Sequence, residues 1–224
     1  KLTAAQRDVI KNYAREKLIG AEVIADSASE MTLQVLLSYP ELSVRDALRR
    51  MFLIASSMQK DSISALEKLD KGVAEEVIRL DNEVDRFSMY VIRQIKLALQ
   101  DPRLITEIGL KNARDCLGFR LIVKSAERVA DHAALIAEKV KLIKKPLEKS
   151  ALGSILTMSA FANSMLEKSV LALFKRDYEV AEQIIVDKDK AKVLEEKVAK
   201  LTLDMPHEDA INLRLISESL RRVA

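Results

Sequence analysis

The sequence contains little of what interrupts helices. Its 224 residues include five glycines, four prolines and 4% aromatic residues. Ala, Leu, Glu, Lys and Arg are abundant instead, and this balance is typical of an α-helical protein. The length is enough for one large domain or two small ones.

The scarcity of cysteine, of long apolar runs and of net charge indicates where the protein acts and which partners it does not require. The single cysteine, Cys116, excludes an intrachain disulfide framework and fits a reducing cytosol. No apolar run reaches the roughly 18 residues of a membrane span, and no secretory signal is visible. We therefore expect a cytoplasmic protein without a transmembrane segment.

The net charge of +3 demands no polyanionic partner. Because the chain starts at Lys1 and stops within a helical pattern, we expect both ends to be incomplete.

The first 43 residues differ in character from the rest. Apolar residues over 2–18 have helical spacing, and Gly20 ends that helix. Residues 21–37 hold two short apolar stretches around a small polar turn at Ser27–Ser29, which indicates either a β-hairpin or a strand leading into a helix. Pro40 ends this segment.

From Ser43 onward the pattern predicts long helices only. Ser43 is placed to cap the first of them, with Asp46 at the third helical position. The predicted helices cover residues 44–69, 73–99, 107–143, 152–175, 180–203 and 208 to the end, with breaks at 70–72, 101–102 and 144–150.

These helices form two copies of one unit. Moving Met58 onto Met165, a step of 107 residues, aligns 54–78 with 161–185 without a gap, and a step of 94 aligns 115–130 with 209–224. Three consecutive helices with short connections pack as an antiparallel bundle. The prediction is an all-α fold of two tandem three-helix bundles with a short N-terminal helix and a possible β-hairpin. Its segments are 1–43, a first repeat over 44–145, and a second, C-terminally incomplete repeat over 146–224.

Four methionines recur at matched places in the two copies. They are Met51, Met58, Met158 and Met165. Methionines at helical spacing either fill a core or line a docking groove, and we favour the core.

Acidic pairs mark the second and third helices of the first copy. Asp81 and Asp85 lie four residues apart in "RLDNEVDRF", and Glu127 and Asp131 repeat the spacing in "ERVADH". Residues at this spacing share one helix face about 6 Å apart, where like charges repel. A cation would offset the repulsion. Oxygen donors without cysteine suit a divalent or trivalent metal such as Mg, Mn or Fe.

A plainer reading of the acidic pairs stays open. Arg79, Arg86 and Arg128 are near enough in sequence to neutralise them on a solvated surface. His132 follows Asp131 but points about 100° away on an α-helix. It fits a surface or capping role better than that of a metal ligand.

The acidic motifs resemble those of a known family. A duplicated three-helix bundle that carries "RLDNEVDRF" and "ERVADHAALIAE" (127–138) resembles the PhoU family of phosphate-uptake regulators over 44–224. The stretches "KLIGAEVIADSASEMTLQVLL" and "ALRRMFLIASSM" resemble archaeal members that carry an AbrB-type DNA-binding domain ahead of the PhoU part. That domain is missing from this chain.

The resemblance implies an intracellular regulator of phosphate homeostasis and not an enzyme. It implies contacts with phosphate transporter or sensor components. It also implies metal binding, with iron as a candidate, at Asp81, Asp85, Glu127 and Asp131. A homodimer is also expected, with the segment 21–37 as a candidate for exchange between chains.

The second copy reverses these charges. Lys188 and Lys192 take the places of Asp81 and Asp85, and Arg221 takes that of Glu127. A cation cannot bind there, so we expect metal in the first copy only. The basic residues Lys188, Lys192 and Arg221 either contact an anion or an acidic partner, or pair locally with Glu195, Glu196 or Asp189.

Two other functions compete with this interpretation of the sequence. A carboxylate-bridged di-iron enzyme needs facing Glu-x-x-His pairs, but neither His132 nor His207 has a Glu three residues earlier. A DNA-binding transcriptional regulator, with this part as its sensor or dimerisation domain, is the stronger alternative. Because no basic patch interleaved with aromatics is present, DNA contact would come from the missing N-terminal domain.

Overall fold

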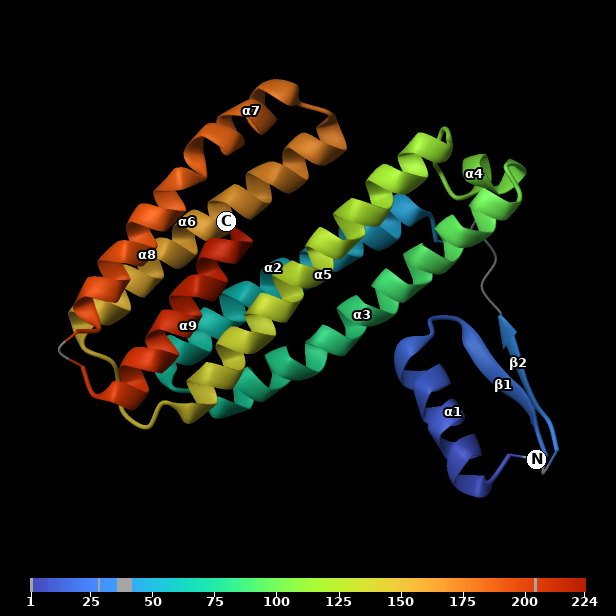
Figure 1. The fold of residues 1–224 in the computed structure, drawn as a ribbon, viewed down its shortest axis with the longest axis horizontal. Coiled ribbons are helices and arrows are strands. Elements are labelled where there is room, and N and C mark those ends of the chain that lie inside the picture. Colours follow the sequence, from blue (N-terminus) through green and yellow to red (C-terminus); the bar gives the residue numbers. More distant parts are fainter. Residues whose placement is uncertain (1, 28, 36–41, 204) are drawn as a thin grey trace. The chain divides into compact units, whose positions relative to one another are not determined.

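The computed structural model describes residues 2–27, 29–35, 42–203 and 205–224 (Figure 1). In chain order its elements are α1 (Ala4–Lys17), β1 (Ala21–Asp26), β2 (Met31–Val35), α2 (Val44–Lys68), α3 (Lys71–Gln100), α4 (Arg103–Glu107), α5 (Ala113–Leu142), α6 (Lys149–Lys175), α7 (Tyr178–Asp187), α8 (Asp189–Leu201) and α9 (His207–Val223). Outside one hairpin, all regular structure in these ranges is helical. The predicted all-α class is confirmed. In the described ranges, no helix combines the length and the apolar character that a membrane span needs.

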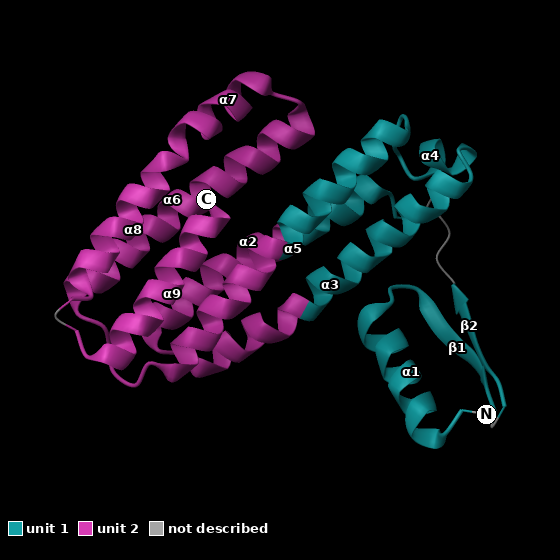
Figure 2. Ribbon diagram, in the orientation of Figure 1, with its two compact units in different colours: residues 1–51, 82–127 teal, residues 52–81, 128–224 magenta. Residues whose placement is uncertain are grey.

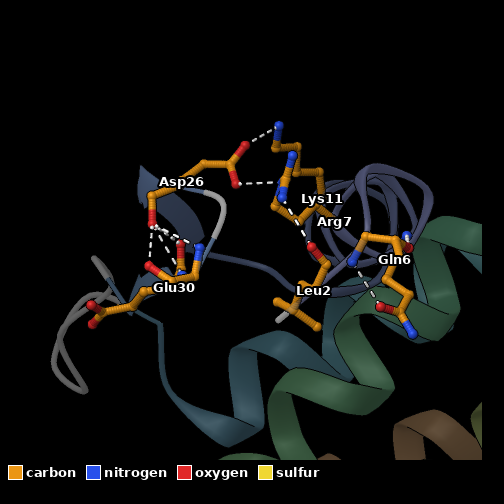
Figure 3. A network of polar contacts seen from close by, with 9 residues as sticks. Leu2, Gln6, Arg7, Lys11, Asp26 and Glu30 are labelled. Carbon is orange, nitrogen blue, oxygen red and sulfur yellow. Dashed lines mark hydrogen bonds and ion pairs between the residues drawn. The ribbon is translucent and has the colours of Figure 1, made fainter.

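The N-terminal segment is a helix packed on a β-hairpin. A capping box starts α1, because Thr3 Oγ1 accepts from the Gln6 N–H at 3.2 Å and the Gln6 side chain accepts from the Thr3 N–H at 2.9 Å. Strands β1 and β2 pair antiparallel, so of the two interpretations of 21–37 the hairpin is correct. Asp26 holds α1 onto β1 through ion pairs with Arg7, at 3.3 Å, and Lys11 (Figure 3). Pro40 lies outside the described residues.

The predicted cap of α2 is present. Ser43 Oγ accepts from the Asp46 N–H at 3.1 Å and donates to the Asp46 carboxylate at 2.7 Å. After Lys68 the chain turns through Leu69, whose φ of 51° is left-handed. Asp70 then caps α3 by accepting from the backbone N–H of Gly72 and Val73. The break predicted at 70–72 is therefore where α2 gives way to α3.

Two helix predictions were wrong in detail. The helix predicted over 107–143 begins later, at Ala113, because Gly109 turns the chain at φ 82° and Asn112 caps the new helix at the Asp115 N–H. The short helix α4 precedes it. The helix predicted over 180–203 is divided into α7 and α8 at Lys188. The division is slight, because Lys188 keeps helical angles and only a tighter bond from Ala191 N–H to its carbonyl marks the junction.

The chain forms two compact units, and its long helices run from one unit into the other (Figure 2). Unit 1 contains residues 1–51 and 82–127, and unit 2 contains 52–81 and 128–224. Helices α2, α3 and α5 contribute to both units. The repeat boundaries at 145 and 146 describe the duplication in the sequence, which this division does not test, and they stay a prediction.

Unit 2 preserves a trace of the duplication. Within it, α6 packs on α7, α8 and α9. Lys60 on α2 and Glu167 on α6 occupy equivalent positions, 107 residues apart, and their side chains meet at 2.8 Å. This ion pair joins equivalent positions of the two copies within unit 2.

The methionine prediction is confirmed. All four recurring methionines are at most 2% exposed, so they fill the core: Met51, Met58, Met158 and Met165. They offer no docking groove.

Candidate functional site

Asp85 lies on α3 within unit 1 and already has a cationic partner. Lys17, the last residue of α1, places its ammonium 2.7 Å from Asp85 Oδ2 and 2.8 Å from the Asn82 side-chain oxygen. The two charged side chains are 26% and 30% exposed. A charge-assisted contact of this length, partly shielded from water, holds Asp85 in place and neutralises it. Sequence reasoning missed Lys17, because only the tertiary structure brings α1 to α3.

Glu127 lies on α5 in the same unit and faces α3. One of its carboxylate oxygens accepts from Ser88 Oγ at 3.3 Å, and the other pairs with Lys124, one turn earlier, at 2.8 Å. Ser88 is three residues beyond Asp85 on α3. Unit 1 therefore brings Glu127 to the turn of α3 that follows Asp85.

Asp81 and Asp131 belong to unit 2. Both are half-buried, and one carboxylate oxygen of Asp81 is buried. Each lies four residues from its partner along a continuous helix, Asp81 from Asp85 on α3 and Asp131 from Glu127 on α5.

The fit of a metal to these acids depends on their chemistry and their grouping. Four carboxylates without a thiolate suit a hard or intermediate cation. Among the residues described, no three Asp, Glu, His or Cys side chains are grouped as ligands. Lysines also hold Asp85 and Glu127, so a cation would have to displace them. The metal site stays a prediction.

The basic residues of the second copy lie in unit 2. Lys188, at the junction of α7 and α8, and Lys192, on α8, are exposed. Arg221 on α9 forms a 2.8 Å ion pair with Glu195 on α8, which is the local pairing weighed as the alternative to an anion contact. Nearby, hydrogen bonds from Lys190 and Gln183 hold the pKa of Asp187 below its usual value.

A small cavity of about 250 Å³ opens between α5 and α9 in unit 2. Its polar lining consists of His132, Lys139, Glu218, Ser219 and Arg222, and Leu135 and Leu215 form apolar walls. Arg222 donates from two nitrogens to Glu218 Oε1, at 2.8 and 3.0 Å. This pairing holds the pKa of the Glu218 carboxyl below its usual value.

His132 is the least expected member of that lining. Its ring is half-buried and its Nδ1 is fully buried without a hydrogen-bond partner in the described chain. Burial lowers the pKa of His132, and the neighbouring cations Arg222 and Arg128 lower it further. The interpretation of His132 as a surface or capping residue did not include α9, which meets this face of α5 at the cavity. Repeat matching could not find the cavity, since His132 and Lys139 lie beyond the aligned stretch 115–130.

Comparison with known proteins agrees with the resemblance seen in the sequence. The family model described as "PhoU domain" matches residues 48–140 and 155–224. The phosphate-specific transport system accessory protein PhoU homolog of Clostridium acetobutylicum is 25% identical over 175 residues, which cover 77% of this chain and 78% of the relative. The protein of the same description from Aquifex aeolicus is 28% identical over 152 residues, with 67% and 66% covered.

Solved structures show the same fold at low sequence identity. PhoU from Pseudomonas aeruginosa superposes with a TM-score of 0.71 at 16% identity and covers 80% of this chain and 88% of that one. The phosphate transport system regulatory protein PhoU from Streptococcus pneumoniae gives a TM-score of 0.70 at 17% identity, with 80% and 86% covered. Because the family model matches most of the sequence in two segments, the chain belongs to the PhoU domain family.

Proposed function

We propose that this protein acts in the cytoplasm and regulates phosphate uptake through contacts with components of the phosphate transport system. The observation that carries the proposal is the PhoU match over 48–140 and 155–224. The relatives found are named as accessory proteins of phosphate-specific transport. A homodimer, and DNA contact through a domain ahead of this chain, stay predictions.

The test of this function is phosphate uptake by the host cell. Deleting the gene should leave uptake unrestrained when external phosphate is abundant, and restoring the gene should return uptake to the original level. Uptake that is the same with and without the protein, measured with radiolabelled phosphate, would contradict the proposal. Chemical cross-linking in intact cells then identifies which transport component it touches.

We further propose that Asp81, Asp85, Glu127 and Asp131 bind a divalent or trivalent cation, with iron as a candidate. These acids would supply oxygen ligands, and the bound cation would relieve the like-charge repulsion at each four-residue spacing. Lys17 and Lys124 neutralise Asp85 and Glu127 in this structure, and a bound cation would take their place. The second copy, with Lys188, Lys192 and Arg221, would bind no cation.

Metal content of the purified protein tests this second proposal. Elemental analysis after purification without chelators should find metal in the wild type and a loss in the double variant Asp81→Asn/Asp85→Asn. The matched control is Lys188→Gln/Lys192→Gln, which changes the equivalent positions of the other copy and should keep the metal. Undiminished metal in the aspartate variant, or equal loss in both variants, would reject the assignment.

A further inference from the structure

The cavity between α5 and α9 contains polar groups that the protein itself does not satisfy. Within the described residues His132 Nδ1 is buried and has no hydrogen-bond partner, and neither Lys139 Nζ nor Ser219 Oγ forms a hydrogen bond. Native proteins leave few buried groups such as His132 Nδ1 unpaired, so this one requires an explanation. The ammonium of Lys139 and the hydroxyl of Ser219 line the same cavity and are available to a ligand. All belong to unit 2, and none is among the acidic residues of the predicted metal site.

The charge around the cavity favours an anion. Lys139 and Arg222 contribute two positive charges to the lining, and Glu218 contributes one negative charge. Glu218 binds only two of the three guanidinium nitrogens of Arg222. Arg128 and Arg221 lie near enough to act on His132 electrostatically, so further positive charge surrounds the site. A small anion would satisfy donors from both helices at once.

The size of the cavity restricts that anion. A volume of about 250 Å³ is below the roughly 300–1,000 Å³ of pockets for larger organic ligands. At about 30 Å³ for each water molecule, it has room for one compact ion with some of its hydration shell. The apolar walls, Leu135 and Leu215, leave the polar groups of Lys139, Ser219 and Arg222 as the contacts that fix the ion.

We propose that this cavity binds inorganic phosphate. Lys139 and Arg222 balance its charge, and Ser219 Oγ donates to an oxygen. Near neutral pH phosphate keeps at least one P–OH group, which needs an acceptor, and the Glu218 carboxylate between the cations provides one. Sulfate has no such proton and would meet Glu218 with like charge. The choice of phosphate rests on the proposed function, whereas the case for an anion site rests on the cavity alone.

Binding is tested by calorimetric titration of the whole chain with inorganic phosphate. Lys139→Gln removes a charged donor worth about 1.5–3 kcal/mol, which corresponds to an affinity about 12- to 140-fold weaker. Ser219→Ala should weaken it less. The control is Lys145→Gln, which removes an exposed lysine outside the lining and should bind as the wild type does. Phosphate binding that is undetectable in the wild type, or equally strong in all three variants, would overturn the site.

Selectivity tests the choice of phosphate. Sulfate should bind the wild type at least tenfold more weakly than phosphate, and Glu218→Gln should narrow that difference, because it replaces the charged acceptor with a neutral amide. Equal binding of sulfate and phosphate by the wild type would overturn the phosphate assignment. The outcomes separate this site from the proposed function: normal uptake in deleted cells rejects the function alone, and failure of titration rejects the site alone.

Discussion

The first turns of α3 and the whole of α7 are equivalent in the repeat, yet their surroundings differ. In α3, Ala74 and Val77 are 0% and 1% exposed. In α7, whose sequence matches these turns, no residue is buried, and Ile185 is 61% exposed. Two helical segments of one ancestry therefore meet different neighbours.

The burial of the first turns of α3 comes from α5. The last turns of α5 lie beside the start of α3, as the 3.0 Å pair of Lys141 with Glu75 shows. Burial of a helix is thus decided by what packs on it and not by its own apolar residues.

An ion pair in the first copy has its two charges reversed at the equivalent positions of the second copy. Glu127 of the first copy pairs with Lys124, one turn away. The equivalents are Arg221 and Glu218, so both signs are reversed in the second copy. There the partners have changed as well, since Arg221 binds Glu195 on α8 and Glu218 binds Arg222. Each copy keeps local neutrality, while only the first keeps acids at the predicted metal positions.

The largest expected difference between the copies concerns their cores. Leu66 is 2% exposed, and its identical equivalent Leu173 is only half-buried. Leu66→Ala should lower the free energy of unfolding by about 2–5 kcal/mol, and Leu173→Ala by less than half as much. Urea unfolding followed by circular dichroism measures both. Equal losses would show that the end of the second bundle is as tightly packed as the first.

A smaller effect is expected at the ion pair that links α1 to the acidic helix. Lys17→Met removes the cation on Asp85, and a partly exposed pair of this kind is worth about 0.2–1 kcal/mol. If a metal binds at Asp85, its affinity should rise about 1.4- to 5-fold, because it no longer competes with the ammonium. Titration with Mn²⁺ measures the change, with Lys192→Met as the control in the second copy. An unchanged affinity for Mn²⁺ in Lys17→Met would show that Lys17 does not compete with metal at Asp85.

The smallest effect concerns stability in acid. The hydrogen bond and charge of Lys141 hold the pKa of Glu75 below its usual 4.5. A lowered folded-state pKa adds stability above pH 4.5 that is lost as the pH falls below it, through the folded-state value. Glu75→Gln should therefore flatten the fall of Tm between pH 5 and 3 slightly. Glu182, its equivalent, forms no ion pair with any described residue, so Glu182→Gln should leave the profile unchanged.

The predictable part of the fold was the part set by neighbours in sequence. The cap at Ser43 and the turn at Asp70 depend on residues within a turn, and both were predicted. The start of α5 was missed, because a left-handed Gly109 followed by a cap at Asn112 interrupts an otherwise helical pattern. The candidate acids could be named from spacing and family likeness, but Lys17 could not, since it lies 68 residues from Asp85.

The sequence by itself determined the helices, their duplication and the exchange of acids for bases between the copies. All of these depend on periodicity and on chemical type, which a linear pattern records. Only the tertiary structure decided that α7 buries no residue within the described chain, that Arg221 is held by Glu195, and that His132, Lys139 and Arg222 line one cavity. These outcomes depend on which helix faces pack against each other. That packing is set by side chains far apart in the chain.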